Sequence, residues 1–313
     1  MKRFAFAITV VVVTVVAGPA QAQLKFNSNQ VAILHWYQAN QTAYFILLGS
    51  PVGLAFDGAN IWVANSAYSN VTKLRASDGS VLGTFNVGSG PIGLAFDGAS
   101  IWVAQLGDGN VTKLRASDGT VLGIFKVGLG PVAVAFDGTN IWVANNSGNT
   151  VTELRASDGR VLGTFNVGSA PTGLAFDGAN IWVANGGDGT VSKLRVSDGK
   201  VLGTFKVGLG PSAVAFDGAD IWVANVESNN VTKLSRTGTT LGAFAVGINP
   251  RALAFDGVAI WVANESSDTV TKLRASDGAV LGTFNVGVEP QSLAFDGANL
   301  WVANSIGNTV SKL

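Results

Sequence analysis

The sequence predicts an all-β fold, a seven-bladed β-propeller of four-stranded antiparallel blades, and three observations lead to it. Each complete repeat divides into four strand-length segments separated by turn residues. The last repeat lacks a fourth segment, and the first repeat is preceded by one. A tryptophan-centred segment recurs about every forty residues, at Trp62, Trp102, Trp142, Trp182, Trp222, Trp261 and Trp301. A period of about 40–45 residues that carries four strands is typical of propeller blades.

The first residues are predicted to be a signal peptide, residues 1–22, rather than part of the fold. Lys2 and Arg3 precede an apolar run over residues 4–18, and Ala20-Gln21-Ala22 has the small-residue pattern of a cleavage site. The run is shorter than the roughly 20 apolar residues of a membrane span, although a retained anchor helix is the alternative. We expect export to the periplasm or the extracellular space, with no membrane contact after cleavage.

Four strands are expected in the first complete repeat, at residues 53–56, 61–65, 71–75 and 81–87. Asp57-Gly58 connects the first strand to the second, and Asp78-Gly79 connects the third to the fourth. Both residue types tolerate the positive φ of tight hairpins. Pro51 precedes the innermost strand, where its missing N–H costs no ladder hydrogen bond.

The closing strand is expected at residues 42–48. This segment aligns forty residues ahead of a fourth strand, so that Phe45 corresponds to Phe85 and Leu47 to Val87. A ring that takes its last strand from the opposite terminus has no open sheet edge. Residues 42–313 should therefore form the propeller, after a lead-in over residues 23–41. Residues 31–34 also resemble a third strand and would compete with residues 310–313.

Composition narrows the possible functions. The chain contains no cysteine, which excludes disulfides, thiolate metal sites and a cysteine nucleophile. Of its twenty basic and twenty acidic residues, Lys2 and Arg3 belong to the signal peptide, which leaves a net charge of −2. Such a surface gives no electrostatic basis for nucleic-acid binding.

The repeat, with Ile-Trp-Val-Ala-Asn as its second strand, resembles the YVTN-type β-propeller repeat, a relative of NHL repeats, over residues 42–313. Those families contain binding proteins and enzymes, so the resemblance implies the fold and leaves the function open. The chain is also similar, at the level of fold, to streptogramin (virginiamycin B) lyases. That resemblance implies a histidine general base and a metal held by acidic residues. The only histidine here, His35, precedes the repeats.

Comparison of the repeats with one another indicates which face of the propeller varies in sequence from blade to blade. The strands and Asp-Gly turns barely change, whereas the loop between the second and third strands and the segment around the proline vary. Variable loops on a rigid scaffold are where binding usually resides, although neutral drift gives the same pattern. The residues that follow the prolines should face the channel mouth, three of them apolar and four polar: Val52, Ile92, Val132, Thr172, Ser212, Arg251 and Gln291.

The candidate ligand-binding residues belong to the polar sector of this face. They are Arg251, Glu265, Asp268, Glu289, Gln291 and Glu227, with the strand-end asparagines Asn225, Asn264 and Asn304. The asparagines have an alternative role, because Asn amides commonly bond the backbone of a following turn. We assign the tryptophans to packing between blades. No catalytic or metal-ligating residue is assigned, and no cofactor is expected.

Two functions are consistent with these features. The first is a monomeric, exported binding scaffold that presents its variable loops to a protein, peptide or surface polymer. The alternative is a metal-assisted lyase or lactonase of the streptogramin-lyase or gluconolactonase-like type. Its metal would be held by carboxylates and amides near Arg251, Glu265 and Glu289.

Overall fold

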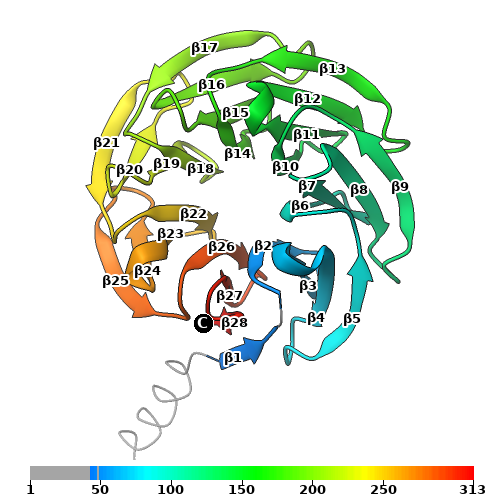
Figure 1. The fold of residues 1–313 in the computed structure, drawn as a ribbon. Coiled ribbons are helices and arrows are strands. Elements are labelled where there is room, and N and C mark those ends of the chain that lie inside the picture. Colours follow the sequence, from blue (N-terminus) through cyan, green and yellow to red (C-terminus); the bar gives the residue numbers. More distant parts are fainter. Residues whose placement is uncertain (1–42, 48) are drawn as a thin grey trace, which may run out of the picture. The chain divides into compact units, whose positions relative to one another are not determined.

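The computed structural model describes residues 43–47 and 49–313. These residues form seven four-stranded antiparallel sheets, arranged as blades around a central opening (Figure 1). The predicted all-β, seven-bladed propeller is confirmed. The signal peptide, the lead-in segment, His35 and residues 31–34 lie outside the described residues.

In six blades the strands follow chain order outward from the opening, and in the last blade β1 is the outermost strand. The innermost strands are β2 (Pro51–Phe56), β6 (Pro91–Phe96), β10 (Pro131–Phe136), β14 (Pro171–Phe176), β18 (Pro211–Phe216), β22 (Pro250–Phe255) and β26 (Pro290–Phe295). The second strands are β3 (Asn60–Asn65), β7 (Ser100–Gln105), β11 (Asn140–Asn145), β15 (Asn180–Asn185), β19 (Ile221–Asn225), β23 (Ala259–Asn264) and β27 (Leu300–Asn304).

The outer half of each blade completes the sheet. The third strands are β4 (Asn70–Arg75), β8 (Asn110–Arg115), β12 (Thr150–Arg155), β16 (Thr190–Arg195), β20 (Asn230–Leu234), β24 (Thr269–Arg274) and β28 (Thr309–Lys312). The outermost strands are β5 (Val81–Asn86), β9 (Val121–Lys126), β13 (Val161–Asn166), β17 (Val201–Lys206), β21 (Thr240–Ala245), β25 (Val280–Asn285) and β1 (Ala43–Ile46). Some loops between second and third strands contain a 3-10 turn: η1 (Ser66–Tyr68), η2 (Asn146–Gly148) and η3 (Glu265–Ser267).

The second strands are continuous apolar runs because neighbouring blades cover both of their faces. The third strands are also mostly buried but include polar residues, as in β4. Trp62 is fully buried. It packs in one cluster with Ile101 and Leu114 of the next blade, and its ring lies 5.5 Å from that of Phe85. The fourth strands instead alternate between exposed and half-buried residues, as in β5. The tryptophans are therefore packing residues between blades, as predicted.

The Asp-Gly turns work differently from the prediction. Only the glycine has a positive φ, for example Gly58 at 95°. Asp57 instead accepts hydrogen bonds through its side chain, from the backbone amides of Ala59 and Asn60 and from the Trp62 indole at 2.8 Å. Burial acts to raise the pKa of Asp57, but these hydrogen bonds hold it below its ordinary value. The turn aspartates thus fix the buried tryptophans, since a buried indole N–H needs an acceptor.

The ring closes through β1, which pairs with β28 in register Phe45 to Val310 (blue beside red in Figure 1). The ring of Phe45 stacks on Trp301 with centroids 5.4 Å apart, as the outer-strand phenylalanines do in other blades. Leu47 is buried in the cluster that joins this blade to the first one. This arrangement agrees with the predicted closure by an N-terminal strand.

Candidate functional site

A β-bulge at the start of every innermost strand positions the candidate site. The pairing register shifts immediately after each proline, so that Val52 has no opposing residue between the pairs Pro51–Asn65 and Gly53–Ala64. Such bulges turn a side chain out of the regular pleat and are frequent next to functional sites. The same shift occurs at each of the seven positions named above, which we call the mouth ring: Val52, Ile92, Val132, Thr172, Ser212, Arg251 and Gln291.

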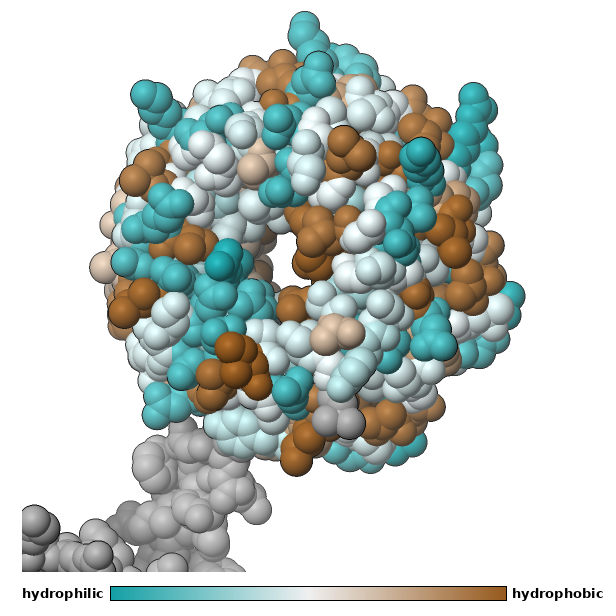
Figure 2. All heavy atoms as spheres, viewed as in Figure 1, coloured by the Kyte–Doolittle hydropathy of each residue, from teal (hydrophilic) through white to brown (hydrophobic). Residues whose placement is uncertain are grey.

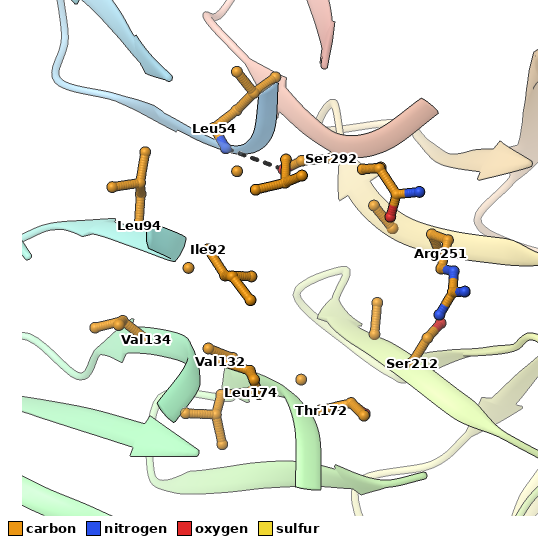
Figure 3. A pocket seen from close by; sticks show the side chains of 18 of the residues that line it. Leu54, Ile92, Leu94, Val132, Val134, Thr172, Leu174, Ser212, Arg251 and Ser292 are labelled. Atoms are coloured by element: carbon orange, nitrogen blue, oxygen red, sulfur yellow. Dashed lines mark hydrogen bonds between the residues drawn. The ribbon is translucent and has the colours of Figure 1, made fainter. Parts of the chain in front are cut away.

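The mouth ring surrounds one end of the central channel. All seven of its residues line a cavity of about 290 Å³, together with Ser66 and Asn146 from the adjacent loops. A second cavity of about 280 Å³ continues inward past Leu54 and Leu94. Figure 2 shows hydrophobic atoms on one side of the opening and hydrophilic atoms on the other. In Figure 3, Ile92, Val132, Thr172, Ser212 and Arg251 are distributed around the same opening.

The structure brings three of the predicted site residues together. Arg251 Nε donates to Glu265 Oε2 at 2.6 Å, and Gln291 Nε2 donates to Glu265 Oε1 at 2.6 Å. Glu265 begins η3, in the loop beside the mouth ring, while Gln291 belongs to the next blade. Both carboxylate oxygens are therefore occupied. The Arg251 side chain remains 41% exposed, whereas that of Glu265 is 14% exposed.

Thr172 and Ser212 give the polar sector two oriented hydroxyl groups. Thr172 Oγ1 donates to the carbonyl of Pro211, and Ser212 Oγ donates to the carbonyl of Pro250, both at 2.8 Å. Because each hydroxyl has a single proton, its oxygen is left as an acceptor. The sequence placed both residues at the mouth but did not reveal this orientation, which depends on the approach of the neighbouring blade.

Asp268 and Glu289 form a contact between adjacent loops. Asp268 Oδ1 accepts the backbone N–H of Glu289 at 2.9 Å. The carboxylate of Glu289 in turn accepts a hydrogen bond from Ser305 Oγ at 3.2 Å. These two predicted residues thus hold the loops beside Gln291. Glu227 is exposed in the loop of another blade, and no ion pair joins it to Arg251 within the part of the chain that the structure describes.

The predicted asparagines are placed beneath the loops rather than at the surface. Asn225, Asn264 and Asn304 are fully buried. The Nδ2 of Asn264 donates to Thr269 Oγ1 and Thr271 Oγ1 on the third strand, and its Oδ1 accepts the N–H of Gly247. A role as a polar ring facing the channel does not agree with this burial. The amides instead connect the end of the second strand to the third strand, through side chains as well as through the backbone.

Two general features concern metals and membranes. Among residues 43–47 and 49–313, no three His, Cys, Asp or Glu side chains gather closely enough to hold a metal ion. The same residues include no helix with the length and hydropathy needed to cross a membrane.

The fold and the site together define the class of protein. It is a seven-bladed β-propeller whose channel mouth has one apolar and one polar sector. No protein-family model matches the sequence, and no curated protein matches it. Solved structures with the same fold include the catalytically inactive virginiamycin B lyase from Staphylococcus aureus with quinupristin. That match has a TM-score of 0.76 and 16% identity, over 87% of this chain and 98% of that one.

Two further structures share the fold. A streptogramin B lyase has a TM-score of 0.75 and 18% identity, over 87% of this chain and 96% of that one. The Kuenenia stuttgartiensis hydrazine synthase has a TM-score of 0.74 and 17% identity, over 95% of this chain and 99% of that one. The predicted fold-level resemblance to virginiamycin B lyases is confirmed, while the YVTN label remains a prediction.

Proposed function

We propose that this chain is an exported β-propeller binding scaffold, which uses the mouth ring and its flanking loops to bind a protein, a peptide or a surface polymer. The observation that carries the proposal is the divided mouth. Val52, Ile92 and Val132 form an apolar sector. On the other side, Arg251 and Gln291 hold Glu265 between them. A concave site with an apolar wall and a few oriented polar groups is the usual form of a binding pocket.

The contrast between the two faces supports this assignment. At the opposite end of the strands, the same turn contact recurs in successive blades, as in Asp57–Trp62 and Asp97–Trp102. Those contacts stabilise the fold and repeat because the fold repeats. At the mouth, the same backbone positions carry different side chains in each sector. The predicted leader supports a location in the periplasm or outside the cell.

The proposal is tested by replacing Arg251, Glu265 and Glu289 together with alanine. Capture of partners from the native envelope should be abolished, while the thermal midpoint stays nearly unchanged. The matched control replaces three exposed arginines at the opposite rim, Arg75, Arg115 and Arg155, with alanine, and it should leave capture intact. Unaltered capture by the mouth variant would remove this face from consideration.

A metal-assisted lyase or lactonase is the second candidate, and the observation in its favour is the fold shared with the streptogramin B lyase. It would require a metal bound by carboxylates and amides near Arg251, Glu265 and Glu289. Titration with calcium or magnesium, followed by tryptophan fluorescence and by isothermal calorimetry, tests it. Saturable binding that the triple alanine variant loses would support this function. Absence of any saturable signal would contradict it.

A further inference from the structure

We infer that the mouth ring binds the free C-terminus of a peptide whose last side chain is apolar, an inference that rests on the proposed binding function and specifies its ligand. Three separate properties of the mouth carry it. The first is an exposed guanidinium. The second is a set of hydroxyl and amide oxygens that can accept hydrogen bonds, because the protons of these groups already bond other protein atoms. The third is an apolar sector on the facing side of the opening.

Arg251 supplies the group that would bind the carboxylate. Its Nε is engaged by Glu265 at 2.6 Å, which fixes the plane of the guanidinium. Among the described residues, neither Nη nitrogen has a hydrogen-bond partner, and the side chain is 41% exposed. Arginine presents its N–H groups in a rigid fork that matches a carboxylate. The mouth therefore offers an oriented pair of donors to an anionic group.

The charge balance favours a singly charged anion. Glu265 lies against Arg251 and is its ion-pair partner. A doubly charged phosphate would approach this carboxylate with only one arginine to offset the repulsion. A cationic ligand is also disfavoured, because both oxygens of Glu265 already accept hydrogen bonds from Arg251 and Gln291. A carboxylate that contacts the Nη nitrogens of Arg251 fits both conditions.

The neighbouring polar groups complement a peptide N–H. The hydroxyl protons of Thr172 and Ser212 are directed to the carbonyls of Pro211 and Pro250. Gln291 donates through Nε2 and keeps its amide oxygen. These polar groups of the mouth ring, of which Ser212 and Gln291 belong to the two blades beside that of Arg251, are thus acceptors. A peptide C-terminus carries an N–H donor close to its carboxylate.

The apolar sector would receive the last side chain. Val52, Ile92 and Val132 line the same cavity as Arg251, and Figure 3 shows Ile92 and Val132 on the side of the opening away from Arg251. The cavity of about 290 Å³ lies just below the range for ligand sites, about 300–1,000 Å³. It suits one side chain with its terminal carboxylate, while the rest of a peptide would pass over the variable loops.

Fluorescence anisotropy with the full chain tests the inference. The probes are a fluorescein-labelled Gly-Gly-Ser-Gly-Leu with a free C-terminus, the same peptide as its C-terminal amide, and Gly-Gly-Ser-Gly-Ser with a free C-terminus. The free leucine peptide should bind at least tenfold more tightly than either of the others. N-acetyl-leucine should compete at least tenfold more weakly than the unlabelled peptide, because it lacks the contacts with the loops.

Matched variants connect the binding to the mouth. Arg251→Lys keeps the charge but loses the fork, and it should weaken binding at least tenfold, whereas Arg75→Lys at the opposite rim should not. Ile92→Asn should weaken binding of the leucine peptide, whereas Ile124→Asn, on the exposed outer strand β9, should not. Circular dichroism melting checks that each variant is folded.

Several outcomes would overturn the inference. Equal binding of the acid and the amide would exclude recognition of the carboxylate, and equal binding of N-acetyl-leucine would exclude a peptide as the ligand. If none of the peptides binds while the triple alanine variant still loses partner capture, the inference is wrong and the scaffold function stands. If that variant keeps capture, the proposed function fails as well.

Discussion

At the residue scale, the backbone before each proline is held in an unusual conformation. The pre-proline residue has a left-handed φ in all seven blades, at the glycines Gly90, Gly130 and Gly210 and at Ser50, Ala170, Asn249 and Glu289. This conformation costs a non-glycine residue about 1–2 kcal/mol. In each of these four cases, the N–H of that residue is accepted by an Asn or Asp side chain from the loop of the adjacent blade, namely Asn308, Asn149, Asn229 and Asp268. Where the pre-proline residue is glycine, the equivalent residue of the adjacent loop is not Asn or Asp but Ser69, Gly109 or Gly189.

This correlation assigns Asp268 the role of holding Glu289, and a mutant pair tests it. Asp268→Ala should lower the free energy of unfolding by about 1 kcal/mol through the lost hydrogen bond. The double variant Asp268→Ala, Glu289→Gly should recover part of that loss, because glycine adopts the left-handed conformation without strain. Urea denaturation measures both changes. A double variant less stable than the single one would contradict the assignment.

At the scale of elements, lysines join neighbouring blades. Lys73 Nζ lies 5.1 Å from the centroid of the Trp62 ring and donates to the carbonyl of Ala116 in the next blade at 2.7 Å. Equivalent bonds to the next turn are made by Lys113, Lys193, Lys233 and Lys312. At this position β12 carries Glu153, which is 7% exposed and accepts a hydrogen bond from Asn140. Burial raises the pKa of Glu153 above its ordinary 4.5, and the carboxylate of Asp137 adds to the shift.

Glu153→Lys should therefore restore the missing contact between β12 and the next blade. A charged hydrogen bond and a cation–π contact with Trp142 together should raise the free energy of unfolding by about 1–3 kcal/mol at neutral pH. The reciprocal change Lys113→Glu should lower it. Chemical denaturation of the two variants measures the difference, and a loss of stability in Glu153→Lys would contradict this account of the junction.

The pH dependence of Glu153→Gln is a separate test of the same residue. Below pH 4.5 the carboxyl is protonated in both the folded and unfolded states, so its burial carries no ionisation cost. As pH rises through the raised pKa, the folded wild-type protein must ionise a buried group and loses stability relative to the glutamine variant. The stability difference between the two proteins should therefore grow from pH 4 to pH 7. A difference that is constant over this range would show that Glu153 does not titrate abnormally.

Particular elements show how far the sequence predicts this structure. The strand boundaries follow from the Asp-Gly turns and the prolines, so the predicted residues 53–56 and the observed Pro51–Phe56 differ only at one end. The mouth ring was predicted because the prolines mark it. The pairing of Glu265 with Gln291 was not predicted, since it depends on how closely two blades approach. The burial of Asn264 was missed for a related reason, because a strand-end amide has the same sequence pattern whether it faces a channel or a third strand.

At the scale of the whole molecule, the two ends of the ring hold it closed. Besides the ladder between β1 and β28, Ser50 donates its N–H to Asn308 Oδ1 at 2.9 Å, and Lys312 donates to the carbonyl of Ala76 at 2.8 Å. Leu54 donates its N–H to Ser292 Oγ at the channel wall. Contacts between the first and last blades thus extend from the channel to the outer rim.

Deleting residues 23–48 should destabilise the protein and promote its association. Leu47 is buried and Phe45 is half-buried. Full burial of such a side chain contributes about 1.5–3 kcal/mol, so Phe45 contributes less than Leu47. Loss of β1 would also leave β28 as an unpaired edge. Deleting residues 23–30 alone should have little effect. Thermal melting and size-exclusion chromatography compare the two truncations. A chain that begins at Gly49 and remains a monomer of wild-type stability would mean that the ring closes in another way.

The claim that the mouth face binds the partner is tested most directly by site-specific photo-crosslinking in the native envelope. A benzoylphenylalanine at Ser66, which lines the mouth cavity from an adjacent loop, is compared with one at Val258, which is 72% exposed in a turn at the opposite end of the strands. We predict a covalent adduct from position 66 and none from position 258. An adduct from position 258 with none from position 66 would contradict the account, because it would place the partner on the face that carries the repeated Asp-Gly turns.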